Sequence, residues 1–374
     1  MTKIVCKRCV VDSTVPDVIF DSDGICNHCH VFDSIDARYE NKVKLSSEYE
    51  AVINKIKVDG KGRDYDCIVG LSGGVDSSYT LLKALDLGLR PLVVHFDNGW
   101  NSDKAIKNIK KMLTILNVDL HTYVVDWQEF RDLQLSFLRA SVSDAEIPTD
   151  IAIKSVLYKL AAKNGIKYIL YSGSNHKTEG RIPRDWTYMD GKYIKSVHKK
   201  YGELKRLKSY PNYTLRNLLY FHVIKRIKLI RLFNFIEFDN NQAIKELEDR
   251  LEWEYYGGKH YESVYTKFFQ SYILPVKHNI DKRIVHYSAL VRSGQITREQ
   301  ALERLKECPY DLSTIEQDKK YIIKKLEIPE DEFESILSRD PKSYKDYSTY
   351  DSIRSRLLPL IKLLKRLKLW PTIA

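Results

Sequence analysis

The segment Ser72-Gly73-Gly74-Val75-Asp76-Ser77-Ser78 stands between a predicted buried strand, residues 67–71, and a predicted helix, residues 78–87. Two adjacent glycines let the backbone approach a ligand closely, and the amides there and at the helix start point toward a shared anion. The serines add hydroxyl donors, while Asp76 is suited to hold magnesium or to fix the loop through backbone amides. The segment therefore predicts a pyrophosphate-binding loop.

Two simpler interpretations of this segment are weaker. A tight turn with a capping serine would explain a bare Ser-Gly-Gly, but not the full seven-residue string after a buried strand. No lysine follows the second glycine at the Walker spacing, which disfavours a kinase-type or GTPase-type loop.

The pattern around the loop alternates between strands and helices. Further strands are predicted at 91–96, 122–125 and 168–171, with helices at 103–116 and through 163. This alternation predicts an α/β fold with a doubly wound parallel sheet, in which ligands bind at the carboxyl ends of the strands.

The chain divides into five predicted parts. Between His198 and Phe235, Glu203 is the only acidic residue, which indicates a basic insert; Thr297 and Gln300 have the form of a capping box in a later, mostly helical region. The predicted parts are a cysteine module at 1–40, a helical linker at 41–64, the sheet domain at 65–195, the basic insert at 196–240 and a helical region at 241–374. A basic apolar helix at 357–368 is expected to dock on the protein or to lie on a membrane surface.

Composition limits the function classes. The 374 residues are 43% hydrophobic, and 61 Lys plus Arg against 50 Asp plus Glu give a net charge of +11. This charge attracts phosphates, nucleic acid or an anionic membrane without choosing among them. No apolar run reaches bilayer length and the first residues lack a signal-peptide pattern, so a cytoplasmic location is expected.

Four cysteines form two pairs, Cys6-x-x-Cys9 and Cys26-x-x-Cys29. Their spacing is that of two zinc knuckles, and four sulfur ligands would close a tetrahedral site, so a structural Zn²⁺ is predicted. Cys67 is predicted to be a small core residue, and Cys308 is predicted to be an isolated cysteine without a chemical role.

The segment Ser72–Ser78 resembles the signature of the PP-loop ATP pyrophosphatases, which cleave ATP between the α and β phosphates. The resemblance implies ATP and Mg²⁺, with nucleotide contacts also after the second and fourth strands. The implied ATP-binding residues are Ser72, Gly73, Gly74, Asp76, Ser77, Ser78, Asp97, Asn98, Gly173 and Asn175.

Further candidates lie outside the loop. Glu146 and Asp150 precede or begin a helix and are suited to bind magnesium or substrate hydroxyls, although helix capping explains one carboxylate in that stretch. Basic residues stabilise charge on departing pyrophosphate, unless they form only a solvated face. The predicted catalytic residues are Asp76, Glu146, Lys282 and Arg283, and the predicted substrate-binding residues are Asp150, Glu179, Lys259 and His260.

Combined motifs narrow the resemblance. The paired cysteines, the loop, and the stretches 256–260 and 268–270 together resemble the N-acetyl sugar amidotransferases of surface-polysaccharide biosynthesis. That family converts an acetamido group on a nucleotide-linked or nonulosonic sugar into an acetamidino group with ATP and ammonia. The resemblance implies that 241–374 completes the active site, and that a separate glutaminase of the histidine-biosynthesis type, with a cyclase-like companion, supplies ammonia. The basic segments leave peripheral membrane contact open.

Two other function classes remain as alternatives. The net charge favours a tRNA-modifying PP-loop enzyme of the lysidine or thiolation type, but thiolation needs a thiolate and no cysteine occurs between Cys67 and Cys308. Nucleic acid is accordingly the less favoured partner. A non-enzymatic adaptor would bind zinc and ATP without releasing pyrophosphate.

Overall fold

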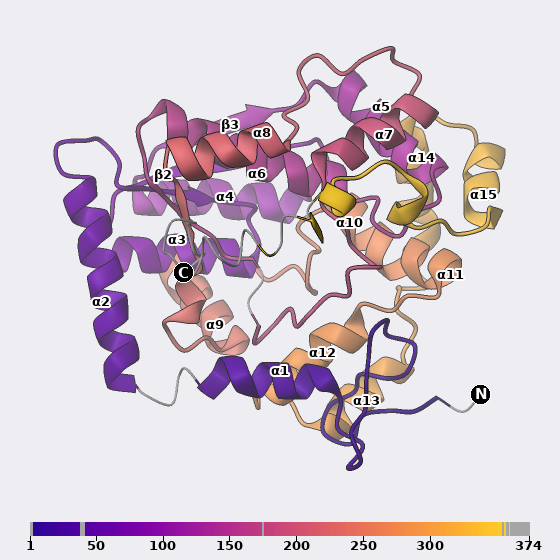
Figure 1. Cartoon of the computed structure of the whole chain (residues 1–374), viewed down its shortest axis with the longest axis horizontal. Helices are drawn as coiled ribbons and strands as arrows, with labels where there is room; N and C mark the ends of the chain where they lie inside the picture. Colours follow the sequence, from indigo (N-terminus) through magenta and orange to yellow (C-terminus); the bar gives the residue numbers. More distant parts are fainter. Residues whose placement is uncertain (1–2, 38–41, 174–175, 354, 357–358, 360–374) are drawn as a thin grey trace.

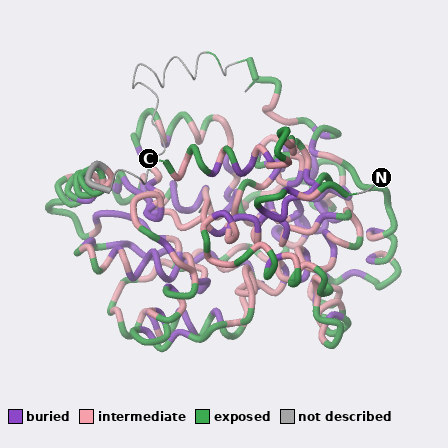
Figure 2. The backbone as a smooth tube through the Cα atoms, turned by 90° about the horizontal axis from the view of Figure 1, so that it is seen from below, coloured by how far each residue is buried: buried purple, intermediate pink, exposed green. Residues whose placement is uncertain are grey.

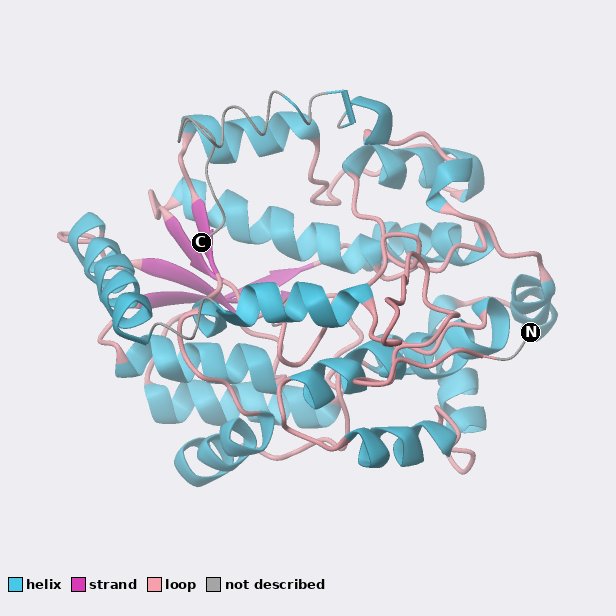
Figure 3. Ribbon diagram, turned by 60° about the horizontal axis from the view of Figure 1, so that its bottom comes forward, coloured by secondary structure: helices cyan, strands magenta, loops and turns pink. Residues whose placement is uncertain are grey.

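A five-stranded, fully parallel sheet forms the centre of the protein, in a computed structural model that describes residues 3–37, 42–173, 176–353, 355, 356 and 359. The strand order is β3-β2-β1-β4-β5, with helices around the sheet (Figures 1 and 3). The strands are β1 (Cys67–Gly70), β2 (Pro91–Asp97), β3 (Leu120–Val124), β4 (Tyr168–Leu170) and β5 (Lys228–Ile230). The predicted α/β class is confirmed.

Residues of the central strands alternate between two hydrophobic cores, as the period of a strand requires. Ile68 and Val94 belong to the core shared with α5 (Trp127–Arg139) and α6 (Ile147–Lys163). Val69 and Val93 belong to the other core, which is shared with α2, α3, α4 and α9. These helices are α2 (Lys42–Asp59), α3 (Val75–Asp86), α4 (Asp103–Leu116) and α9 (Asn240–Leu251). Figure 2 shows the buried segments running through the middle of the molecule.

Local signals place the ends of the helices. The helix predicted at 103–116 matches α4, whose N-cap Ser102 accepts a hydrogen bond from the amide of Ala105. By contrast, α3 begins at Val75, three residues before the predicted start, because Gly74 is its N-cap. The capping box between Thr297 and Gln300 is confirmed.

The segment predicted as a basic insert needs a correction. It contains β5, which pairs in parallel with β4 through Lys228 opposite Tyr168 and Ile230 opposite Leu170. The sheet domain therefore does not end at 195. A three-residue strand that lies among Arg and Lys residues is too short to show a strand pattern in the sequence. Its pairing with β4, rather than its own β propensity, explains why it forms a strand. The same segment holds most of α7 (Gly191–Tyr201), α8 (Leu215–Leu219), the π-helix η2 (Tyr220–Ile224) and the short η3 (Leu232–Asn234).

Helices make up most of the remaining chain. The N-terminal module contains α1 (Asn27–Asp36), which lies near α12 and α13 (Figure 1). The C-terminal elements are α10 (Val264–Phe268), the π-helix η4 (Phe269–Ile273), α11 (Leu274–His278), α12 (Arg283–Arg292), α13 (Arg298–Lys306), α14 (Ile315–Leu326), α15 (Glu330–Ser338) and η5 (Tyr344–Asp346). The basic helix predicted at 357–368 falls, except for Pro359, outside the described residues. Within the described part of the chain, no helix is both long enough and apolar enough to cross a membrane.

Candidate active site and metal centre

The loop after β1 folds tightly on itself. The backbone amide of Ser72 donates to Ser77 Oγ at 3.1 Å, and the two hydroxyls lie 3.0 Å apart. Gly73 has φ +83°, and a Cβ there would lie 2.8 Å from the carbonyl oxygen of Ala105. Glycine is therefore required twice over at this position, for its backbone conformation and for its close approach to α4. Ser78 Oγ is buried and has no hydrogen-bond partner among the described residues.

Residues 253–256, which are far from this loop in sequence, form hydrogen bonds with its backbone. The indole Nε1 of Trp253 donates to the carbonyl oxygen of Gly73 at 3.1 Å. The amide of Val75 donates to the hydroxyl of Tyr256, also at 3.1 Å. Neither aromatic residue was predicted to contact the loop, although Tyr256 belongs to a stretch that the sequence singles out.

Asp76 lies in the first turn of α3 with its carboxyl group surrounded by protein. Its Oδ1 is buried without a hydrogen-bond partner in the described part of the chain. Burial raises the pKa of Asp76 to about 6, although the nearby ammonium of Lys259 lowers it in part. A buried carboxylate oxygen that no protein group satisfies is a suitable ligand for a hard cation such as Mg²⁺.

Glu262 reaches the same loop from the C-terminal half of the chain. A Cβ at Gly74 would lie 3.1 Å from Glu262 Oε1, which places this carboxylate against the loop. Backbone hydrogen bonds hold it there: the amide of Ser102 donates to the Glu262 carbonyl and that of Val264 to the Trp100 carbonyl, each at 2.8 Å. Glu262 was not among the predicted site residues, because the distance in sequence from the loop conceals this contact.

The start of α6 supplies a second pair of carboxylates. Glu146 occupies the N-cap position of α6 without a side-chain capping hydrogen bond, and Asp150 lies in the first turn of the helix. Glu146 Oε2 accepts from Lys282 Nζ at 3.2 Å and from Gln270 Nε2 at 2.8 Å. The side chain of Asp150 is exposed to solvent, although many protein groups, among them Glu146 and Lys282, lie around it. Burial, reinforced by Glu146, raises its pKa to about 7.

Two histidines with opposite electrostatic environments lie side by side. The rings of His260 and His286 have centroids 5.8 Å apart. Burial opposes the charge on His260, but Glu262 and other nearby carboxylates outweigh it and raise the pKa. Burial, with Lys259, His260 and Lys282 nearby, lowers the pKa of His286 well below its usual range. Opposed shifts of this kind are typical of acid and base pairs. His260 also has φ +64°, an uncommon conformation outside glycine that recurs at functional sites.

These groups form one electrostatic unit, which we call the central cluster. Lys259 Nζ lies 4.0 Å from Glu179 Oε1. Asp76 interacts electrostatically with Lys259 and Glu179, and Asp150 interacts with Lys282 and again with Glu179. The central cluster comprises Asp76, Glu146, Asp150, Glu179, Lys259, His260, Glu262, Lys282 and His286. It brings together residues from the sheet domain and from the helical C-terminal region.

Arg283 is not part of the central cluster. Its guanidinium binds Asp281 through Nε and Nη2, at 3.1 and 2.8 Å, and donates to the carbonyl oxygens of Arg304 and Glu307. Neighbouring acceptors engage the Arg283 side chain, so its predicted role as a catalytic donor receives no support from these contacts and stays a prediction.

The predicted nucleotide contacts Asp97, Asn98 and Gly173 lie at or just after the ends of β2 and β4. Asp97 Oδ1 accepts from the Gly99 amide at 2.9 Å, while Asn98 donates to Thr149 Oγ1 at 3.2 Å. A Cβ at Gly173 would lie 2.6 Å from the Tyr171 hydroxyl, so a larger residue there would displace the Tyr171 side chain. Asn175 lies outside the described residues.

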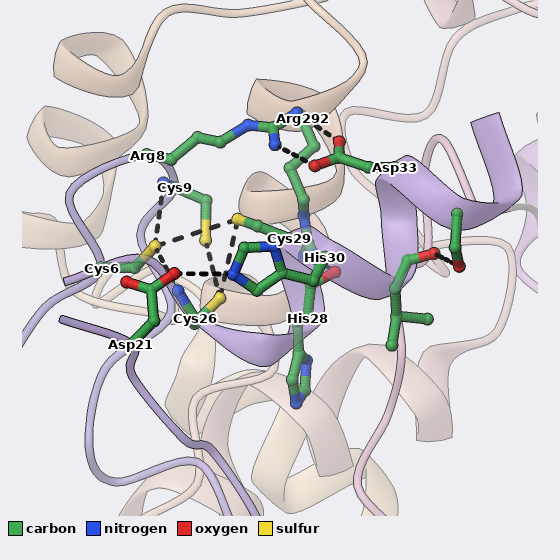
Figure 4. Close-up of polar contacts among 12 residues, drawn as sticks. Cys6, Arg8, Cys9, Asp21, Cys26, His28, Cys29, His30, Asp33 and Arg292 are labelled. Carbon is green, nitrogen blue, oxygen red and sulfur yellow. Dashed lines mark hydrogen bonds and ion pairs between the residues drawn. The ribbon is translucent and has the colours of Figure 1, made fainter. Parts of the chain in front are cut away.

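The four cysteines of the N-terminal module meet at one buried point (Figure 4). Cys6 and Cys29 have sulfurs 3.9 Å apart, and both Cys9 to Cys26 and Cys26 to Cys29 measure 3.7 Å. A tetrahedral site with Zn–S bonds of 2.3 Å has sulfur–sulfur edges of about 3.8 Å. The four thiols therefore fit a closed, structural zinc site.

Histidines near the cysteines do not take part in the sulfur cluster. His30 Nε2 pairs with Asp21 at 2.7 Å, and the His28 ring points away from the sulfurs (Figure 4).

Two arginines of the C-terminal helices form hydrogen bonds with the backbone of the cysteine module. Arg298 Nε donates to the carbonyls of Cys6 and Cys9 at 3.2 and 3.1 Å, and Arg292 Nη1 donates to that of His28 at 3.0 Å.

Comparison with known proteins gives a family match over part of the chain. Residues 262–367 match the family described as "LPS biosynthesis protein WbpG-like, C-terminal domain". The matched range contains Glu262, Lys282 and His286 of the central cluster. Among solved structures, the NMN synthetase from Francisella tularensis is similar at 12% identity and a TM-score of 0.29, over 58% of this chain and 99% of that chain. No curated protein matches.

Proposed function

We propose that the protein is an ATP-dependent amidotransferase, which adenylates the acetamido carbonyl of an N-acetyl sugar and replaces the resulting AMP by ammonia. The observation that carries this proposal is the central cluster, which joins Asp76 beside the loop to Glu146 and Lys282. The match of 262–367 to an LPS biosynthesis family supports surface polysaccharide as the destination of the sugar.

The loop and its neighbours would bind the nucleotide. Backbone amides near Gly74 and the start of α3, with the hydroxyls of Ser72 and Ser78, suit the two terminal phosphates of ATP. The unsatisfied Asp76 oxygen would hold Mg²⁺, which supplies charge neutralisation to the phosphates when bound. The turns at Asp97, Asn98 and Gly173 would contact the adenosine.

The proposed chemistry needs two displacements. The acetamido oxygen forms a bond to the α-phosphorus of ATP while the bond to the β-phosphate oxygen breaks, and pyrophosphate leaves with the electron pair. Lys259, protonated His260 and Lys282 stabilise this developing negative charge. Ammonia then adds to the activated carbon, AMP leaves with the former amide oxygen, and an acetamidino group remains. Neutral His286, whose ring lies 5.8 Å from that of His260, would accept a proton from the nitrogen.

Ammonia would come from a separate protein. Glutaminases of the cysteine type need an accessible, activated thiol, whereas burial raises the pKa of Cys67 far above its usual range. Cys308 is exposed, and the side chain that forms a hydrogen bond with it is the hydroxyl of Tyr310 rather than a histidine. We propose a glutaminase of the histidine-biosynthesis type, with a cyclase-like companion, as the partner. In this proposal 1–40 is a zinc module, while 241–374 completes the active site on the sheet domain.

The proposed function is tested by identifying the sugar product of the reaction. Purified protein is incubated with ATP, Mg²⁺, ammonium and a panel of nucleotide-linked or nonulosonic N-acetyl sugars, and the sugars are analysed by mass spectrometry. Replacing an amide oxygen by NH lowers the mass by about one unit. A tRNA-modifying enzyme would leave every sugar unchanged and release pyrophosphate only when tRNA is added.

A further inference from the structure

The helical stretch formed by α8 and η2 exposes several apolar side chains to solvent; α8 lies at the outside of the molecule (Figure 1). Its inner side packs on the protein, where Phe221 stacks on Tyr158 of α6 with ring centroids 5.6 Å apart. Its outer side carries four exposed large hydrophobic residues within six positions, and Ile224 is 69% exposed. These residues are Leu219, Tyr220, Val223 and Ile224.

The four side chains share one face of the helical stretch. Positions 219, 220, 223 and 224 are separated by the intervals that bring helical side chains together. Single exposed apolar residues are ordinary on protein surfaces, but a contiguous group rimmed by polar residues marks an interaction site.

A basic rim surrounds this apolar face. Arg216, Lys225, Arg226 and Lys228 are all exposed. No acidic residue occurs from 204 to 236, so these charges have no acidic neighbour in sequence. Lys225 Nζ lies 5.6 Å from the centre of the Tyr220 ring, so charge and apolar surface are in direct contact. We call residues 216–228 the basic apolar surface.

The basic rim and the apolar face together indicate which kind of partner binds this surface. The segment 360–368 of this chain is apolar but carries Lys362, Lys365, Arg366 and Lys368, so its charge repels the basic rim. Nucleic acid would match the rim but would gain nothing from exposed valine and isoleucine. An anionic bilayer offers phosphates to the rim and acyl chains to the apolar face.

We infer that the basic apolar surface binds an anionic lipid bilayer peripherally, with the apolar side chains entering the headgroup region. This contact does not depend on the proposed catalytic function. Membrane binding by a single short helical stretch is weak, so it requires both the apolar insertion and the electrostatic attraction.

Vesicle sedimentation tests the inference with the full chain. We expect binding to vesicles containing phosphatidylglycerol, little binding to pure phosphatidylcholine vesicles, and release from the anionic vesicles at high salt. The double variant Val223→Asp/Ile224→Asp and the charge reversal Lys225→Glu/Lys228→Glu should each weaken binding by about tenfold or more. The control Leu312→Asp changes another exposed residue, 73% accessible, and should bind as the unaltered protein does.

Circular dichroism and thermal unfolding test whether each variant is folded. We expect all of them to fold, because the altered side chains are exposed. A further variant lacking residues 357–374 separates the two basic apolar segments. Retained binding in that variant supports the assignment to 216–228. The inference is overturned if anionic vesicles are not bound, or if Val223→Asp/Ile224→Asp binds them normally while removal of 357–374 abolishes binding.

Discussion

Lys282 Nζ lies 3.2 Å from Glu146 Oε2, and the two residues are the N-caps of α12 and α6, respectively. Both side chains are largely buried, at 12% and 13% exposed. A lysine is electrostatically unfavourable at a helix N-terminus, so its place here is explained by the carboxylates that it faces rather than by helix stability. The pair joins the helical C-terminal region to the sheet domain at the central cluster.

Replacing Lys282 by methionine should therefore affect catalysis more than folding. We expect the rate of pyrophosphate release to fall by about 100-fold or more, because a buried positive charge that stabilises the leaving group is lost. Steady-state kinetics with sugar, ATP and ammonium measure the effect. Lys306→Met is the matched control, since its exposed ion pair with Glu303 lies outside the central cluster. Equal rates in both variants would show that Lys282 has no catalytic role.

Asp76→Asn tests the proposed magnesium ligand. Asparagine keeps the size of the side chain but removes the charge that a divalent cation needs, so pyrophosphate release should be abolished. The zinc content should not change, because the four cysteines lie in another module. Plasma mass spectrometry measures zinc, and a coupled phosphate assay measures pyrophosphate. A variant that still releases pyrophosphate at the original rate would remove the role assigned to Asp76.

Asp150 makes a prediction about pH and stability. Its pKa of about 7 in the folded protein is higher than its value of about 3.9 in an unfolded chain, so folding favours the neutral form. The resulting stabilisation is complete below about pH 4 and is lost as the pH rises through 7. Asp150→Asn should thus be more stable than the unaltered protein at pH 8, by about 1 kcal/mol once solvent screening of this accessible group is allowed for.

The stability difference between Asp150→Asn and the unaltered protein should shrink as the pH falls toward 5. Urea unfolding without nucleotide, measured from pH 5 to pH 8, gives this difference directly. Asp249→Asn, which alters an exposed residue of α9, is the matched control. A difference that is independent of pH would contradict the assignment of a raised pKa to Asp150.

The cysteine module predicts a dependence of stability on metal. Cys26→Ser removes one ligand from the closed site, and we expect loss of bound zinc together with a fall of about 2 kcal/mol or more in the free energy of unfolding. Cys308→Ser changes an exposed cysteine outside the module and should alter neither quantity. Full zinc content in Cys26→Ser would show that the four sulfurs do not act together as ligands.

The loop and the central strands could be predicted because their signals are local. A buried run such as 67–71 followed by Gly73 and Gly74 determines both the strand and its turn, and Ser102 marks the start of α4. The cysteine spacing likewise predicts the sulfur cluster, because the two cysteines of each Cys-x-x-Cys pair are close in sequence and therefore close in space.

Other features depend on contacts between distant segments, which one sequence does not reveal. β5 has only three residues and is recognised by its pairing with β4. Glu262 belongs to the central cluster because backbone hydrogen bonds, from Ser102 to Glu262 and from Val264 to Trp100, hold this segment beside the loop. Arg283 had the chemistry of a catalytic donor, but the adjacent Asp281 engages it.

The nucleotide product tests the central claim most directly. ATP labelled at the α-phosphate is incubated with the protein, Mg²⁺, ammonium and an N-acetyl sugar that it accepts, and the labelled nucleotide is separated by chromatography. Our account predicts labelled AMP, with one pyrophosphate released for each AMP formed. Labelled ADP with orthophosphate, or unchanged ATP with every sugar offered, would contradict it.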